Sequence, residues 1–158
     1  MEKIYLAFQT FLSGVIAWIS ARLGILFPVL CVFMCMMIVD YITGMIASKQ
    51  ESLDHPDDPT YGWSSKKGSK GIIKKVGYLC VIAVAMVVDF IITKVSAEVG
   101  LQLNVKAFFG LLVSVWYLLN ELLSIIENAG RMGVAVPDWL QRYIAALKGS
   151  LDDQSKKE

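Results

Sequence analysis

Four long apolar runs constrain this 158-residue chain more than any other feature of its sequence. They cover residues 4–21, 25–47, 76–93 and about 105–126. The last three are each near or above the roughly 18–20 residues that a helix needs to cross about 30 Å of hydrocarbon. Apolar residues make up 56% of the chain and charged residues 18%, a balance too apolar for a small soluble domain. We therefore predict an all-α integral membrane protein with three or four transmembrane helices.

The apolar runs divide the chain into three parts. These are an N-terminal amphipathic or transmembrane helix, a membrane domain, and a C-terminal helix with a charged tail, at residues 1–22, 23–130 and 131–158. Within the membrane domain, residues 48–75 are rich in Pro, Gly, Ser, Asp and Lys and are predicted to form a solvated loop. After Pro137, a short amphipathic helix is expected from about Asp138 to Leu147.

Run 4–21 has two different faces on a helical wheel. Large apolar side chains gather on one half, and small or polar side chains gather on the other. The candidate lumen face consists of Gln9, Thr10, Ser13 and Ser20. Two interpretations stay open: this face packs on a neighbouring helix or rests in the headgroup region, or it lines water. The absence of charge between Ile4 and Ala21 slightly favours four spanning helices over three with run 4–21 on the surface.

Basic residues lie mainly on one side of the predicted membrane. Segment 48–75 holds six lysines and the part after residue 126 holds five basic residues, whereas the opposite side has three, or four with Lys3. The positive-inside rule then places the loop and the C-terminus in the cytoplasm. The lysines expected to set topology and contact anionic lipid are Lys66, Lys67, Lys70, Lys74 and Lys75. No aromatic residues are interleaved with them, so we expect no nucleic-acid site.

Two carboxylates interrupt the apolar runs in the predicted cytoplasmic half of the membrane. Asp40 precedes Lys49 by nine residues, about 13 Å of helix, and Glu121 is similarly placed in the fourth run. Because an ionised aspartate facing lipid costs roughly 2.5–3.5 kcal/mol, Asp40 needs a partner in protein or water. Its candidate partners are Lys74, Lys75, Asn120 and Glu121. Asp40 then either clamps helices in register or becomes exposed to an aqueous lumen when copies assemble.

Other polar residues in and beside the apolar runs complete a set of candidate packing or assembly residues. The set consists of Asp40, Thr43, Gly44, Asp89, Asn120, Glu121, Ser124, Glu127 and Asn128. Asp89 differs from the others because it lies close to Lys94 and the predicted outer surface. The single histidine, His55, and the three cysteines stand at no metal-ligand spacing, and no serine has a histidine at defined spacing to activate it. We therefore expect no catalytic residue, no bound metal and no cofactor. We also expect that the protein is not an enzyme.

Three blocks of sequence, in the same order along the chain, resemble the signatures of one known family. They are DYITG at 40–44, SSKKGSKGIIKK at 64–75, and the segment 120–137 with NELLSIIEN, GRMG and VP. These blocks are similar to those of the toxin secretion/phage lysis holin family. The resemblance implies a phage- or prophage-encoded protein that forms homo-oligomeric, non-specific lesions in the bacterial cytoplasmic membrane. An endolysin or a toxin would pass through them as cargo, without specific binding, and host lysis would follow.

A second class of function stays open from the residues alone. A membrane-anchored adaptor or antiholin-like regulator would use the basic loop 48–75 to recruit a partner. In both classes the lipid bilayer is the first partner. Only the holin requires many copies of the chain to assemble.

Overall fold

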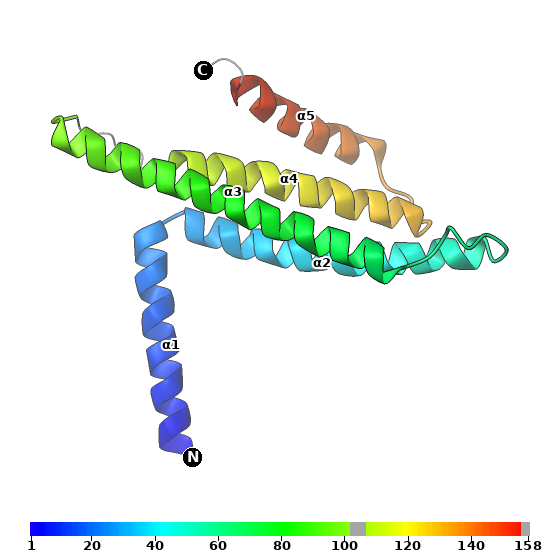
Figure 1. The fold of residues 1–158 in the computed structure, drawn as a ribbon, viewed down its shortest axis with the longest axis horizontal. Helices are drawn as coiled ribbons and strands as arrows, with labels where there is room; N and C mark the ends of the chain where they lie inside the picture. The colour runs from blue at the N-terminus through cyan, green and yellow to red at the C-terminus, as the bar shows by residue number, and fades with distance from the viewer. Residues whose placement is uncertain (102–106, 156–158) are drawn as a thin grey trace.

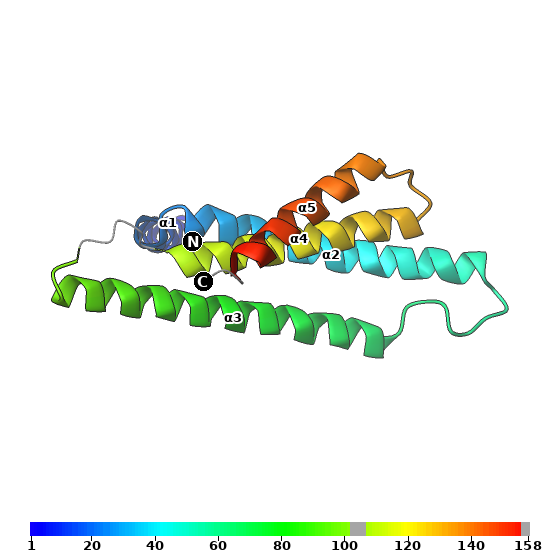
Figure 2. The same cartoon turned by 90° about the horizontal axis from the view of Figure 1, so that it is seen from above.

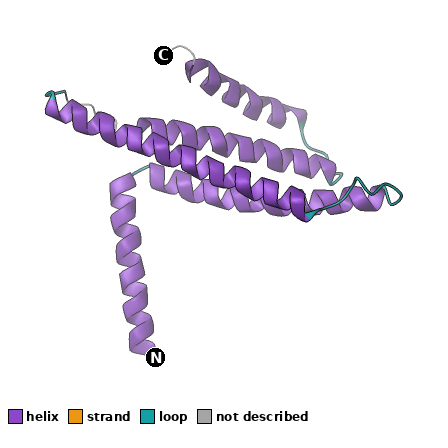
Figure 3. Ribbon diagram, in the orientation of Figure 1, coloured by secondary structure: helices purple, strands orange, loops and turns teal. Residues whose placement is uncertain are grey.

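The protein consists of five α-helices in a computed structural model that describes residues 1–101 and 107–155 (Figures 1 and 3). The helices are α1 (Glu2–Leu23), α2 (Leu26–Asp54), α3 (Ser65–Glu98), α4 (Phe108–Arg131) and α5 (Asp138–Ser155). The described ranges contain no β-strand. The predicted all-α architecture with a short C-terminal helix is confirmed.

Four of the helices are long and apolar enough to cross a membrane. At 1.5 Å per residue, α1 spans about 33 Å and α4 about 36 Å, whereas α2 and α3 reach about 43 Å and 51 Å. The longer two exceed the roughly 30 Å of hydrocarbon, so part of each must project into water. The predicted range of three or four spans therefore agrees with the helix lengths.

Helices α2, α3 and α4 run side by side as a bundle, as both views show (Figures 1 and 2). Helix α4 is central, because it contacts α2, α3 and α5. Helix α1 contacts α2 alone among the described elements and leaves the bundle crosswise. The chain turns between α1 and α2 at Gly24, whose φ of 55° is readily adopted only by a residue without a Cβ.

The bundle is filled by a layer of aromatic and aliphatic side chains at its middle. Phe33 of α2 is fully buried and packs with Met37 and Ile82. Its ring centroid lies 6.5 Å from that of Tyr78 and 6.4 Å from that of Tyr117, and the two tyrosine rings stack at 4.1 Å. Because Tyr78 comes from α3 and Tyr117 from α4, this layer ties all three helices together.

The connection between α2 and α3 is shorter than the loop predicted at 48–75. Helix α2 continues to Asp54 and α3 begins at Ser65, so only residues 55–64 lack helix. The Ser64 hydroxyl accepts a bond from the amide of Lys67 at 3.2 Å and so caps the N-terminus of α3. A hydropathy profile shows where a helix leaves the lipid and not where the helix ends. Both α2 and α3 continue as helix beyond their apolar runs, with mostly polar side chains.

Segment 55–64 is held by local contacts, among them the stacked rings of His55 and Tyr61, whose centroids lie 4.3 Å apart. The amide and hydroxyl of Thr60 donate to Asp58 at 2.9 and 2.7 Å, and the hydroxyl bond above all lowers the pKa of that carboxyl. The ammonium of Lys67 donates to the carbonyls of Thr60 and Gly62 at 3.3 and 3.1 Å. The loop is thereby fixed to the first turn of α3.

Two further differences from the sequence prediction concern the ends of α4 and α5. Helix α5 runs to Ser155 and is longer than the stretch expected at 138–147. Helix α4 begins at Phe108, while the start of the fourth apolar run, at 105–106, lies outside the described residues. Ile144 of α5 is buried, and α5 contacts α4.

Candidate functional site

An ion-pair cluster joins the three bundle helices through the predicted intramembrane carboxylates. The ammonium of Lys75 on α3 donates to Asp40 Oδ2 at 2.8 Å and also to Glu121 Oε2. The side chains of Lys75 and Asp40 are each 15% exposed, and Glu121 is 4% exposed. One cation thus bridges a carboxylate of α2 and one of α4, so each carboxylate has a positively charged partner away from water. Lys75 is one of the partners predicted for Asp40.

The amide of Asn128 provides the second contact to Asp40. Its Nδ2 donates to Asp40 Oδ1 at 3.1 Å and lies 3.2 Å from the hydroxyl of Thr43. Gly44 lies beside this amide, and a Cβ there would be in ordinary van der Waals contact with Asn128 Nδ2, at 3.5 Å. The sequence pointed to Asn120 as the amide partner of Asp40, but Asn128, two helical turns further along α4, has that role. The spacing alone could not distinguish them.

A bidentate ion pair extends this network and was missed in the sequence. Arg131 donates through Nε and an Nη to the two carboxylate oxygens of Glu51 at 2.7 and 2.8 Å, and through its other Nη to Asn128 Oδ1 at 2.9 Å. Glu51 lies eleven residues after Asp40, which returns to nearly the same face of α2. That spacing, with Arg131 three residues after Asn128, is the signal that could have revealed the pair.

Two small cavities flank the cluster. One, of about 260 Å³, is lined by Asn120, Glu121, Ser124 and Glu127 among others, and the other, of about 320 Å³, by Tyr41, Gly44, Trp63 and Asn128 among others. Asp40 and Lys75 line both. The cavities have room for water and several polar groups each to bind it. The structure thus gathers all but one of the predicted packing residues around one polar centre.

The exception, Asp89, caps a helix at the other end of the bundle. Its two carboxylate oxygens accept bonds from the amides of Phe109 and Gly110 at 2.9 and 2.7 Å. A carboxylate in this position satisfies amides that have no partner within α4 and lies at the positive end of the helix dipole. Asp89 is 7% exposed, so protein groups surround it, and it lies five residues before Lys94 on α3.

Gly110 makes the close approach between Asp89 and α4 possible. A Cβ at this position would lie 3.2 Å from Asp89 Oδ2, 3.2 Å from Met86 Cγ and 3.3 Å from Leu26 Cδ2. The hydroxyl of Ser114, fully buried one turn later, donates back to the Gly110 carbonyl at 2.6 Å. Small residues at this crossing therefore bring α2, α3 and α4 together.

Of the remaining predicted residues, Lys74 lines the smaller cavity beside the cluster and Lys67 the larger one, and the others line neither. The candidate lumen residues Gln9, Thr10 and Ser13 are exposed on α1, and Ser20 is half-buried near the turn into α2. Lys66 and Lys70 are exposed on the first turns of α3, while Lys74 lies 5.7 Å from the ring centroid of Tyr78. Of the five loop lysines, Lys75 alone forms an ion pair among the described residues.

Comparison with known proteins agrees with this arrangement. The model of the bacteriophage holin family matches residues 17–149. An uncharacterised protein of Halalkalibacterium halodurans is 35% identical over 127 residues, which are 80% of this chain and 81% of that protein. An uncharacterised protein of Listeria innocua is 33% identical over 126 residues, 80% and 76% of the two chains.

A third relative comes from another genus. An uncharacterised 14.9 kDa protein of Clostridium perfringens, encoded in the nagH 3′ region, is 29% identical over 137 residues and covers 86% of each chain. No solved structure matches the sequence significantly. The holin match covers α2 to α4, the cluster around Asp40 and the cap at Asp89. The chain belongs to the bacteriophage holin family.

Proposed function

We propose that this protein is a holin that assembles in the bacterial cytoplasmic membrane into non-specific lesions. An endolysin or a toxin would leave the cell through them without a specific binding site. The observation that carries the proposal is the holin match across α2, α3 and α4, together with four helices of membrane-spanning length. The family match supports a holin-like membrane protein, and lesion formation is our inference from it.

The packing of the bundle supports a lesion between copies rather than through one copy. Phe33, Tyr78 and Tyr117 fill the interior at mid-height, and Asp40 and Asp89 are paired within their own chain. A water-filled path inside one copy would have to break this layer. A path bounded by several copies leaves it intact, which favours homo-oligomers over a narrow monomeric channel.

The distribution of charge supports a cytoplasmic C-terminus. Asp138 and Arg142 of α5 are 83% and 80% exposed, and an ionised side chain facing lipid costs roughly 2.5–3.5 kcal/mol. In the structure α5 folds back beside α4 (Figures 1 and 2), and we infer that its charged side chains keep it out of the hydrocarbon in the membrane. By the positive-inside rule, the many basic residues around loop 55–64 and α5 support a cytoplasmic location for both.

The test is induced expression of the full chain in bacteria, with and without a co-expressed endolysin. We expect oxygen uptake and membrane potential to fall abruptly in both cultures, and cell density to fall only in the culture with endolysin. Continued respiration while the protein is abundant in the membrane fraction would overturn the proposal.

Purified protein in liposomes provides the second measurement. A holin should release both a small dye and a protein-sized labelled dextran, because its lesions pass a folded enzyme. Release of the dye alone would indicate a narrow channel. No release, with a stable small complex in detergent, would instead support the adaptor or antiholin-like regulator.

A further inference from the structure

Among the described residues, helix α1 contacts the rest of the protein only near its C-terminal end. None of its residues is buried, and only Ile19, Ser20 and Leu23 are even half-buried. The helix runs crosswise to α2, α3 and α4, and both views show this direction (Figures 1 and 2). If the bundle crosses a membrane, a helix in this orientation runs along the membrane plane.

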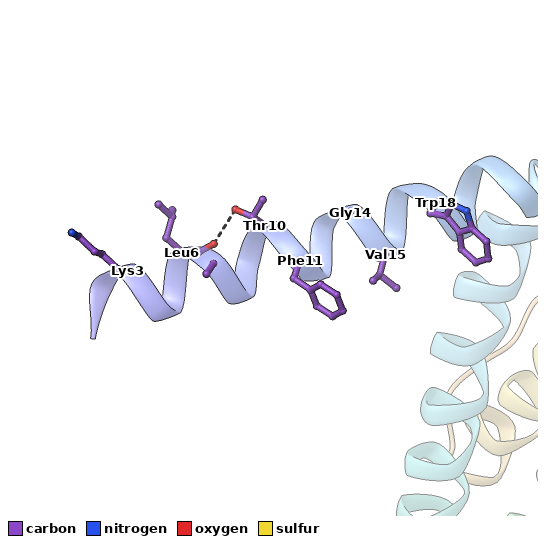
Figure 4. Close-up of a pocket in the computed structure, with 8 residues that line it drawn as sticks. Lys3, Leu6, Thr10, Phe11, Gly14, Val15 and Trp18 are labelled. Atoms are coloured by element: carbon purple, nitrogen blue, oxygen red, sulfur yellow. Dashed lines mark hydrogen bonds between the residues drawn. The ribbon is translucent and has the colours of Figure 1, made fainter.

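The two faces of α1 point in opposite directions relative to the bundle. Figure 4 shows Phe11 and Val15 on the side of α1 toward which α2 runs, and Leu6 and Thr10 on the opposite side. The Thr10 hydroxyl donates to the Leu6 carbonyl of its own helix at 2.9 Å. The pocket whose lining residues Figure 4 draws is formed by α1 residues alone, so it is an open face of this helix. The large apolar half of α1 therefore faces the membrane interior.

Helix α1 lies at the depth of one boundary of the hydrocarbon layer. The helix joins α2 next to Leu26, which is 1% exposed and packs at the crossing of Gly110 and Asp89. Lys94 of α3 lies five residues beyond Asp89, about 7 Å further along the helix. A lysine at the end of an apolar run marks the boundary with water. Helix α1 thus lies about 7 Å from that boundary, within the roughly 5–10 Å to which an interfacial helix buries its apolar face.

We propose that α1 does not cross the membrane but lies in the phospholipid headgroup region, at the end of the bundle opposite loop 55–64. Its large apolar half dips into the acyl chains, and its small and polar half faces water. Trp18 and Tyr5 lie at the two edges of the apolar half, where interfacial aromatic residues are favoured. Glu2 and Lys3 lie on the polar half.

The phospholipid surface is the occupant that the structure favours for the apolar face. Only Gly24 and Ile25 separate α1 from α2, on which the apolar side chains of Val32, Met34 and Ile38 are also exposed. Its large side chains are open, with Phe11 69% and Trp18 63% exposed. The inference rests on the membrane placement of α2, α3 and α4 and does not require that lesions form.

Single cysteines in the full chain test the proposal. The background carries Cys31→Ala, Cys35→Ala and Cys80→Ala, and the test positions are Lys3→Cys, Ser13→Cys, Phe11→Cys and Ser69→Cys. Each variant is expressed at a low level, before respiration falls, and treated with a membrane-impermeant maleimide in right-side-out and inside-out vesicles. Ser69 is exposed on α3 near loop 55–64 and reports the side of that loop.

An interfacial α1 places Lys3→Cys and Ser69→Cys on opposite sides, whichever way the bundle is oriented. We expect Lys3→Cys and Ser13→Cys to react from the same side at similar rates, and Phe11→Cys to react at least tenfold more slowly. Labelling of Lys3→Cys and Ser69→Cys from the same side would show that α1 spans the membrane. Protection of Ser13→Cys with oxidative cross-linking between copies would show that a second chain covers the polar face. Either result overturns the proposal.

Discussion

Lys75 is the residue on which the polar centre depends, because in the described part of the chain it is the cation that forms ion pairs with both Asp40 and Glu121. Removing it would leave two carboxylates facing each other in a site that is nearly closed to water. Removing one partner of a buried ion pair typically costs about 3–5 kcal/mol, since the remaining charge is left uncompensated.

Lys75→Met should therefore lower the free energy of unfolding in detergent by about 3 kcal/mol or more. The matched control is Lys70→Met, which changes an exposed lysine of the same helix and should shift stability by less than about 0.5 kcal/mol. Adding Asp40→Asn and Glu121→Gln to Lys75→Met removes the unpaired charges and should restore most of the loss. Equal stability of the Lys70 and Lys75 variants would contradict this role.

Gly110 is the second residue where a small change should have a large effect. In Gly110→Ala the new methyl group would meet Asp89 Oδ2, Met86 and Leu26 at 3.2–3.3 Å, so the cap of α4 must shift. We expect a loss of about 1–3 kcal/mol in thermal or denaturant unfolding. Gly77→Ala, with no atom within 4 Å of the new Cβ, should instead be neutral or slightly stabilising. A larger loss of stability in Gly77→Ala than in Gly110→Ala would show that α2, α3 and α4 are loosely packed around Gly110.

Helix α3 is the element whose extent was hardest to predict. Its first eleven residues, SKKGSKGIIKK, are mostly polar, and a hydropathy profile treats them as loop. Helix formation there depends on the cap by Ser64 and on Gly68, where a Cβ would lie 3.2 Å from both Trp63 Cζ2 and the Tyr41 hydroxyl. Such contacts depend on the path of the chain and not on composition.

Loss of the Ser64 cap should loosen this polar part of α3. We expect Ser64→Ala to cost about 1 kcal/mol and to speed amide hydrogen exchange over residues 65–68, with little change beyond residue 76. Ser69→Ala, an exposed change within the same helix, should leave exchange unchanged. Unchanged exchange in Ser64→Ala would mean that the contacts of Gly68 alone hold the first turn.

The sequence was sufficient for the elements that lipid selects. Apolar runs located all four long helices, and the cost of a charge in lipid led from Asp40 to four candidate partners, of which Lys75 forms the ion pair. The choice of Asn128 over Asn120 depends on how α4 is rotated against α2. The role of Asp89 depends on where α4 begins in space, twenty residues later in the chain. Neither rotation nor position can be read from spacing along one helix.

The whole molecule has a closed interior and an outer surface rich in exposed apolar side chains, so lesions under our proposal require several copies. Dye release from liposomes should then rise more steeply than linearly with the protein-to-lipid ratio, with an apparent order above about two. The full chain with its bundle weakened by Lys75→Met should release dye at a different threshold. Release strictly proportional to protein would indicate that a single copy is sufficient.

The crosswise direction of α1 gives each copy an L-shaped outline. If the shorter arm lies in a single leaflet, that leaflet gains area while the opposite leaflet gains none, and the imbalance grows with every added copy. Bilayers relieve such a mismatch by bending or thinning. Crowding alone would then strain the membrane mechanically, before any two chains have formed a specific contact.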